Sequence, residues 1–217
     1  HPVKLDESLF IHPVYNTWIE LTFYQSQEGV LNYAQDVLDH GLKPSVIMID
    51  DGWSDYYGKW TFSKEKFSDP EKMLQELHRM GFKVMVWVCP FITPDTLEYR
   101  ELEKAGLLLT DKTGEVYISH WWNGRFAVLD MTKEAACDWL KKQLNDLQAI
   151  GVDGFKFDAG DSIYYPQDGI VSGDDHSKAW AKFGEAYPLN EYRVTTGAGG
   201  WSLMQRMCDK DHSWGST

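Results

Sequence analysis

The stretch GVDGFKFDAGD at residues 151–161 decides the fold. A glycine follows an amphipathic helical pattern here, and a short apolar run of strand length then ends in acidic residues. Gly151 suits the left-handed backbone that commonly ends a helix. A helix, a glycine and a buried strand in this order are typical of a crossover unit in a parallel sheet, where ligands bind at the carboxyl ends of the strands. We therefore expect Asp158 and Asp161 on the functional face.

The same order of segments recurs along the chain. Apolar spacing predicts helices over 27–40, 69–80 and 133–150, and strands over 17–23, 45–50, 83–89 and 154–158. Two weaker strands are expected over 191–195 and 203–208, and residues 90–130 form an insertion after the third strand. Four to six such units predict an α/β fold, either a doubly wound sheet or part of a (β/α)8 barrel.

The composition excludes several classes of function. The 217 residues include 21 Lys and Arg against 33 Asp and Glu, a net charge of −12 that argues against binding nucleic acid or anionic lipid. The longest apolar runs have the length of a strand, whereas about 20 residues are needed to span a membrane. Three widely spaced cysteines predict neither a disulfide framework nor a zinc site. The 10 Trp, 11 Tyr and 10 Phe supply stacking surfaces for a polyhydroxylated ligand.

Acids and tryptophans follow neighbouring strands at the point where each strand ends. The second strand runs into DDGW at residues 50–53, and the third ends near Trp87. A single aspartate in such a position is usually a turn former, but acids at two strand ends favour a binding site. Because side chains alternate along a strand, we expect Asp50 and Asp51 to face opposite sides, so that only one reaches the ligand and the other caps the turn at Gly52.

The fourth strand carries a lysine and an aspartate on one face. Lys156 and Asp158 alternate with Phe155 and Phe157, so the two pairs point to opposite faces. A neighbouring ammonium favours the ionised carboxylate that a glycosidase nucleophile requires. Two alternatives are a Schiff-base aldolase with Lys156 as nucleophile and a purely structural ion pair. No further ligand spacing accompanies the acids, so we expect neither a metal site nor a cofactor.

With DDGW at 50–53 and GFKFDAGD at 154–161, the chain resembles glycoside hydrolase family 31, which comprises retaining α-glycosidases on a (β/α)8 barrel. The resemblance runs from about residue 18 to 214. Within the family it is greatest to the branch of the myogenesis-regulating glycosidase and its bacterial relatives, through FKFDAG, HWW at 120–122 and QRMCDKDHSWG at 205–215.

The resemblance implies a single catalytic barrel domain over residues 1–217, incomplete at about six βα units. A whole family member should have a β-sandwich domain before the barrel and further strands after it. We therefore expect an open barrel edge and, for the isolated chain, weak or absent activity.

The resemblance also implies roles for individual residues. It makes Asp158 the nucleophile, Asp51 a ligand of sugar hydroxyls and Trp121 an aromatic wall. Arg193 matches the family arginine that precedes the acid/base by about sixteen positions, which points to Asp209, with Asp211 as the alternative. The remaining residues expected to contact substrate are Asp50, Trp53, Trp87, Lys156 and Arg206.

The implied activity is exo-acting hydrolysis of a terminal α-linked sugar in an oligosaccharide or glycoside. An α-galactoside is favoured, with α-glucoside and α-xyloside as other candidates. Three alternatives remain: a family 36 α-galactosidase, which also carries DDGW; a non-catalytic carbohydrate-binding barrel; and the Lys156 aldolase.

Overall fold

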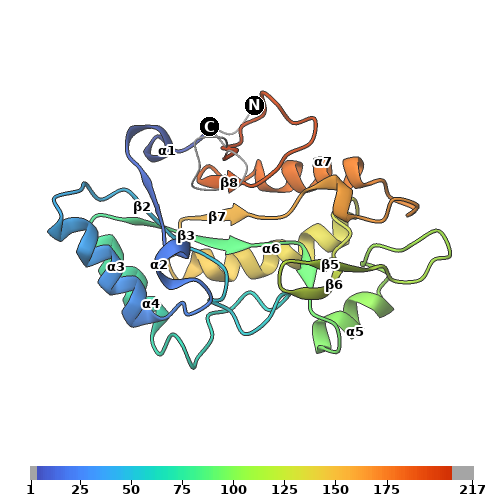
Figure 1. Ribbon diagram of the computed structural model, residues 1–217, viewed down its shortest axis with the longest axis horizontal. Helices are drawn as coiled ribbons and strands as arrows, with labels where there is room; N and C mark the ends of the chain where they lie inside the picture. Colours follow the sequence, from blue (N-terminus) through green and yellow to red (C-terminus); the bar gives the residue numbers. More distant parts are fainter. Residues whose placement is uncertain (1–3, 207–217) are drawn as a thin grey trace.

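A parallel sheet forms the centre of the computed structural model, which describes residues 4–206 (Figure 1). Its five strands lie in the order β1-β2-β3-β7-β8 and all pair in parallel. Their bounds are β1 Val14–Asn16, β2 Val46–Ile49, β3 Lys83–Val88, β7 Gly154–Phe157 and β8 Asn190–Tyr192. The sheet corresponds to part of a (β/α)8 barrel, with β1 and β8 at its edges within the described residues.

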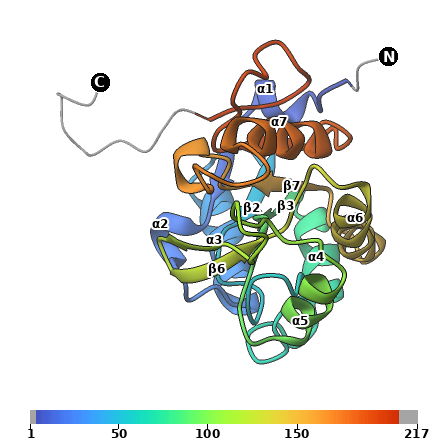
Figure 2. The same ribbon diagram turned by 90° about the vertical axis from the view of Figure 1, so that its right-hand side faces the viewer.

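Four helices cover one face of the sheet, as Figure 2 shows from the side. They are α3 Gln27–Asp39, α4 Pro70–Arg79, α6 Glu134–Ala149 and α7 Gly173–Gly184. Ile47, Val86 and Phe155 of the sheet belong to the same buried cluster as the apolar stripes of these helices. This packing is the outer layer of a barrel, and it buries the side chains that alternate with the inward-facing ones.

A second, smaller cluster covers the inner face. Val46, Met48 and Met85 point away from the helices and pack with Leu9 of the short helix α1, Ser8–Ile11. Toward the carboxyl ends of the strands this apolar inner layer gives way to Lys156 and Asp158. The strands therefore present an apolar inner base and a charged upper end.

The prediction of a strand over 17–23 is wrong. The strand β1 lies earlier, and the chain then turns into the short helix α2, Trp18–Leu21. The side chain of Asn16 accepts the backbone N–H of Trp18 at 2.8 Å, and Leu21 N–H bonds to the Thr17 carbonyl at 2.9 Å. These local bonds replace the ladder that the apolar pattern of TWIELTF predicts.

Residues 90–130 fold into a small antiparallel sheet beside the barrel strands. It consists of β4 Phe91–Ile92, β6 Gly124–Val128 and β5 Ile118–Trp121 in that order, with helix α5, Leu97–Lys104, between β4 and β5. Figure 1 shows this sheet at the right, next to the end of β3.

The C-terminal part of the structure, from residue 162 onward, differs from the expected pattern. The expected strand at 191–195 is β8, which begins one residue earlier and ends at Tyr192. From 203–208, residues 204–206 run beside β8 through a parallel bridge between Tyr192 and Gln205, and residues 207 and 208 lie outside the described part. The helix α7 and the short 3-10 helix η1, Ser162–Tyr164, were not expected. No helix within residues 4–206 is long and apolar enough to cross a membrane.

Candidate active site

A cavity of about 600 Å³ opens at the carboxyl ends of β2, β3 and β7. Residues expected from the sequence to contact substrate line it together, and they come from strands far apart in the chain: Asp50, Asp51, Trp87, Lys156, Asp158, Arg193 and Arg206. The parallel register brings Trp87 opposite Lys156 on neighbouring strands, which explains why these side chains meet.

Lys156 lies between two aspartates at the floor of the cavity. Its side chain is almost fully buried, and its Nζ is 2.8 Å from Asp50 Oδ2 and 3.9 Å from Asp158 Oδ2. Burial by itself lowers the pKa of Lys156, but the charges of Asp50 and Asp158 outweigh it and hold this pKa above its usual value. The lysine is therefore a cation at neutral pH.

The carboxylate of Asp158 is held at both oxygens by N–H donors. The indole N–H of Trp87 donates to Oδ2 at 2.6 Å, and the backbone N–H of Ala159 donates to Oδ1 at 2.8 Å. Arg193 Nε lies 3.9 Å from Oδ1. Two hydrogen bonds to the carboxylate fix its rotamer, and the cations Lys156 and Arg193 lie near it.

The backbone after Asp158 is held from behind by the helical layer. Ala159 has φ +65° and Gly160 has φ +98°, so the chain turns sharply away from the strand. Trp180 of α7 donates its indole N–H to the Asp158 carbonyl at 3.0 Å, and Gly160 N–H donates to the Tyr165 hydroxyl at 3.0 Å. A non-glycine residue in the left-handed region costs energy, and surrounding contacts of this kind hold it in place.

Asp50 and Asp51 both line the cavity, which corrects the expectation that only one of them could. The strand β2 ends at Ile49, so strand alternation does not extend to the two acids. Asp50 Oδ2 accepts the Asn16 amide at 2.8 Å as well as Lys156, and Asp50 Oδ1 accepts the Asp51 N–H at 2.8 Å. The carboxylate of Asp51 instead accepts the Tyr57 hydroxyl.

Burial raises the pKa of Asp51 to about 7, despite the opposing hydrogen bond from Tyr57. The negative charge of Asp50 acts in the same direction as burial. Asp51 therefore changes its charge near neutral pH, and in its protonated form it can donate a hydrogen bond.

Two of the expected substrate-contacting tryptophans lie in the core and do not line this cavity. Trp53 is fully buried, and its indole N–H donates to the backbone carbonyl of Trp87 at 2.8 Å. Trp121 is 4% exposed and packs against Phe91 and Tyr164.

The next residue in the chain, Trp122, takes the exposed position instead. It is 43% exposed, lines the cavity and lies with its ring 5.7 Å from the Arg193 guanidinium. Because neighbouring residues in the β5–β6 hairpin point to opposite faces, Trp121 and Trp122 cannot both face the cavity.

Several cavity residues were not expected from the sequence. Asn16, Trp18, Ile19 and Phe23 come from the end of β1, the helix α2 and the turn that follows it. An earlier start of the first strand would have placed Asn16 at a strand end, where the other site residues occur. Asp209 and Asp211 lie outside the described residues. Within residues 4–206 no group of three or more His, Cys, Asp or Glu side chains could hold a metal ion.

A family model describing the TIM-barrel domain of family 31 glycosyl hydrolases matches residues 14–206. The mouse myogenesis-regulating glycosidase is 31% identical over 214 residues, which cover 95% of this chain and 30% of that protein. The α-xylosidase XylQ of Lactiplantibacillus pentosus is 31% identical over 153 residues, which cover 69% of this chain and 20% of that protein. The chain thus spans less than a third of the length of these relatives.

Solved structures show the same fold at lower sequence identity. The family 31 dextranase of Flavobacterium johnsoniae, in complex with glucose, has a TM-score of 0.77 at 20% identity, covering 89% of this chain and 26% of that one. The cycloalternan-degrading enzyme of Trueperella pyogenes has a TM-score of 0.78 at 20% identity, covering 100% of this chain and 36% of that one. These matches confirm the barrel fold, and the family model shows that this chain belongs to the TIM-barrel domain of glycoside hydrolase family 31.

Proposed function

We propose that this barrel carries the catalytic nucleophile and sugar-binding floor of a retaining exo-α-glycosidase. The observation that carries the proposal is the environment of Asp158, whose two carboxylate oxygens accept N–H bonds while Lys156 and Arg193 lie 3.9 Å away. An ionised, oriented carboxylate at the carboxyl end of a barrel strand is what a glycosidase nucleophile requires.

In the first step, Asp158 attacks the anomeric carbon and the bond from that carbon to the aglycone oxygen breaks. A carboxylic acid gives its proton to the departing oxygen, so the aglycone leaves as an alcohol and the sugar stays as an ester on Asp158. In the second step water attacks the same carbon, gives its proton to the acid's conjugate base and releases the free sugar. We assign the acid/base to Asp209, with Asp211 as the alternative. A retaining mechanism requires the two carboxyl groups to come within about 5–5.5 Å of each other.

The other polar residues of the floor would bind the sugar. Asp50, Asp51 and Arg206 line the same cavity as Asp158 and present carboxylate and guanidinium groups that pair with hydroxyls. Trp87 faces both the cavity and the nucleophile, so it contacts substrate and orients Asp158. Trp53 acts on the site through its bond to the Trp87 backbone.

The aldolase alternative does not fit the charge of Lys156. A Schiff-base lysine has to lose its proton before it attacks a carbonyl, whereas two aspartates raise the pKa of Lys156. The family 36 alternative is replaced by the match to the family 31 barrel domain. A carbohydrate-binding barrel without turnover remains the competing function, and labelling separates it from the hydrolase.

The experiment is covalent labelling of the natural full-length polypeptide with a 5-fluoro-α-glycoside or a cyclitol epoxide, followed by peptide mass spectrometry. We expect the label on Asp158 and none in the Asp158→Ala variant. The matched control is Asp55→Asn, because Asp55 lies at the surface in an ion pair with Lys59. Binding without a label would favour the non-catalytic barrel, and full activity of Asp158→Ala would refute the assignment.

A panel of p-nitrophenyl α-glycosides would identify the sugar. We propose α-galactoside as the preferred substrate, following the resemblance of FKFDAG and QRMCDKDHSWG. α-Xyloside and α-glucoside complete the panel because relatives carry the names α-xylosidase and α-glucosidase. A higher kcat/KM for either of these two would overturn the galactoside preference alone.

A further inference from the structure

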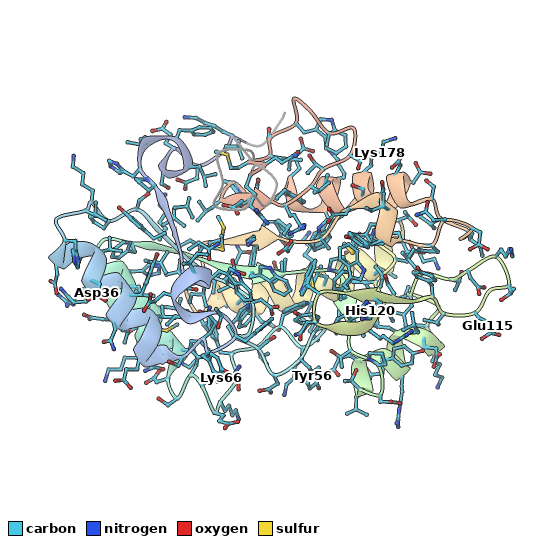
Figure 3. All side chains as sticks on the ribbon, viewed as in Figure 1. Asp36, Tyr56, Lys66, Glu115, His120 and Lys178 are labelled. Carbon is cyan, nitrogen blue, oxygen red and sulfur yellow. The ribbon has the colours of Figure 1, made fainter. Side chains whose placement is uncertain are left out.

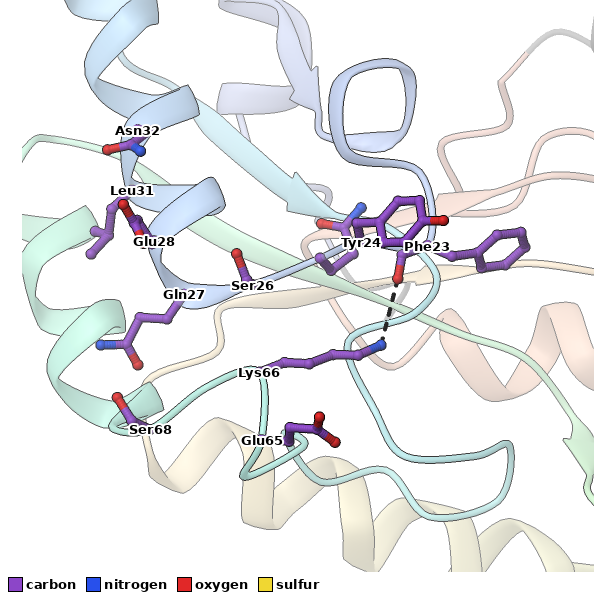
Figure 4. A pocket seen from close by; sticks show the side chains of 11 residues that line it. Phe23, Tyr24, Ser26, Gln27, Glu28, Leu31, Asn32, Glu65, Lys66 and Ser68 are labelled. Atoms are coloured by element: carbon purple, nitrogen blue, oxygen red, sulfur yellow. Dashed lines mark hydrogen bonds between the residues drawn. The ribbon is translucent and has the colours of Figure 1, made fainter.

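A second cavity lies on the catalytic face, outside the site described above. Its volume is about 820 Å³, and it lies between the start of α3 and the segment that leads into α4 (Figure 4). Tyr24, Gln27 and Asn32 line it from one side, and Glu65 and Ser68 line it from the other. We refer to it as the Tyr24 cavity.

The fold explains why this cavity is on the catalytic face. The helices α3 and α4 follow β1 and β2, so they begin at the carboxyl ends of the parallel strands, where the active site lies. Figure 3 labels Lys66 and Tyr56 along one edge of the molecule, and both belong to the connection between β2 and α4.

The Tyr24 cavity adjoins the central cavity through shared residues. Phe23 lines both of them. A smaller cavity of about 430 Å³ also shares Phe23 with each, and in addition shares Lys66 with the Tyr24 cavity and Asp51 with the central one. The three cavities therefore lie next to one another, and Phe23 forms part of the wall of each.

The wall at Phe23 is held in place by backbone contacts. Lys66 donates to the Gly52 carbonyl at 2.6 Å and to the Phe23 carbonyl at 3.5 Å, as the dashed line in Figure 4 shows for Phe23. Gly52 has φ +95°, and a Cβ there would lie 2.9 Å from the Phe23 carbonyl oxygen. The ammonium group of Lys66 is thus hydrogen-bonded to backbone carbonyls, and Lys66 also lines the cavity.

The remaining lining groups are available to a ligand. Tyr24 is 84% exposed and presents its ring to solvent. Within residues 4–206, the side chains of Asn32, Glu65 and Ser68 make no hydrogen bond with one another or with other side chains or backbone groups. An exposed aromatic ring beside free amide, carboxylate and hydroxyl groups suits a sugar ring, which has an apolar face and a rim of hydroxyls.

We propose that the Tyr24 cavity is a distal subsite for a neutral oligosaccharide whose terminal unit occupies the central cavity. One pyranose ring packs on Tyr24, and hydroxyls of the neighbouring units pair with Asn32, Glu65 and Ser68 elsewhere in the cavity. Glu28 and Glu65 both line the cavity and disfavour anionic sugars. This inference rests on the proposed glycosidase function, and it makes a longer α-linked oligosaccharide the natural substrate.

The test compares substrates of different length in the natural full-length polypeptide. The probes are a p-nitrophenyl α-glycoside, which fills the central cavity, and di- to pentasaccharides that carry the same terminal unit. We expect Tyr24→Ala to lower kcat/KM about twofold to tenfold on the longer oligosaccharides, which is the loss of one ring contact, and to leave the aryl glycoside unchanged. Tyr24→Phe keeps the aromatic ring, so its kcat/KM on the longer oligosaccharides should stay close to that of the parent.

Controls and alternative outcomes make the test decisive. Leu97→Ala changes a residue that is also highly exposed but lines none of the three cavities, so it should leave all substrates unchanged. An equal loss on all chain lengths, or no loss on any, would overturn the subsite. If no glycoside is hydrolysed, the proposed function fails, whereas binding of sulfur-linked oligosaccharides, compared between Tyr24→Ala and the parent by calorimetry, still decides the subsite.

Discussion

Replacing Asp51 by asparagine should remove a large part of the pH dependence of stability. Burial raises the pKa of Asp51 from 3.8 to about 7 in the folded protein. Between pH 3.8 and about pH 7, Asp51 is protonated in the folded state but ionised in the unfolded chain. The free energy of unfolding therefore falls as pH rises through this interval, because the unfolded state binds fewer protons.

The size of the effect follows from the shift. A difference of about 3 pKa units corresponds to about 4 kcal/mol, since each unit is worth about 1.4 kcal/mol. Asparagine keeps the shape and still accepts the Tyr57 hydroxyl, but it does not titrate. The free energy of unfolding of Asp51→Asn minus that of the parent should increase by about 4 kcal/mol between pH 4 and pH 8.

Urea unfolding followed by tryptophan fluorescence at several pH values measures this difference. Asp55→Asn is the matched control, because Asp55 lies nearby but its hydrogen bond to Lys59 lowers its pKa. Its difference from the parent should be small, of opposite sign and confined to acidic pH. If the free energy of unfolding of Asp51→Asn minus that of the parent stays constant between pH 4 and pH 8, Asp51 is ionised in the folded protein and the reasoning is refuted.

Three further predictions concern the same region. Trp87→Phe removes the N–H donor of Asp158 Oδ2 and should lower kcat about tenfold to hundredfold on an aryl α-glycoside with a smaller change in KM; an unchanged kcat would contradict a role in orienting the nucleophile. Lys156→Met leaves two buried acids without their cation and should lower the free energy of unfolding by about 3–5 kcal/mol, measured in urea, whereas Lys156→Arg should lose less. Gly154→Ala should destabilise by about 1–3 kcal/mol, because the new methyl group meets the Leu189 backbone; thermal unfolding measures it, with Gly199→Ala, which has open space around it, as the control for added bulk.

The strands that pack on both faces could be predicted from the sequence. In β2, β3 and β7 short, largely apolar runs that follow a helix and a glycine carry the signal locally, and the structure places strands there within one residue at either end. Strand alternation alone predicted that the side chains of Lys156 and Asp158 lie on the same face of the sheet, and the structure places them 3.9 Å apart. Such predictions succeed because the period of a strand is fixed by covalent geometry.

Predictions failed where pairing between distant segments decides which way a side chain points. Asp50 and Asp51 lie past the end of β2, so their directions depend on Asn16, Lys156 and Tyr57. A similar dependence applies to the adjacent tryptophans of the β5–β6 hairpin, whose exposure is set by pairing with residues 124–127. In both cases the direction of the side chain depends on contacts that the spacing of apolar residues along the sequence does not indicate.

The helix α7 escaped prediction because its buried face is only partly apolar. His176, Ser177 and Gly184 are among its buried residues, and these types do not contribute to a hydrophobic stripe. Gly184 faces Tyr192, whose hydroxyl occupies the space that a side chain at Gly184 would need. The helix is therefore specified by shape against β8, a tertiary feature.

The arrangement of charges around Lys156 matters most at the step where the nucleophile becomes neutral. In the proposed mechanism Asp158 is converted to an ester, so it no longer balances the buried ammonium. Lys156 makes its short ion pair with Asp50, at 2.8 Å, and only a longer one of 3.9 Å with Asp158. Esterification therefore does not leave Lys156 without a partner, and the large cost of an unpaired buried charge does not arise. Asp158 is instead oriented by the neutral N–H groups of Trp87 and Ala159, which leave its charge largely available for attack.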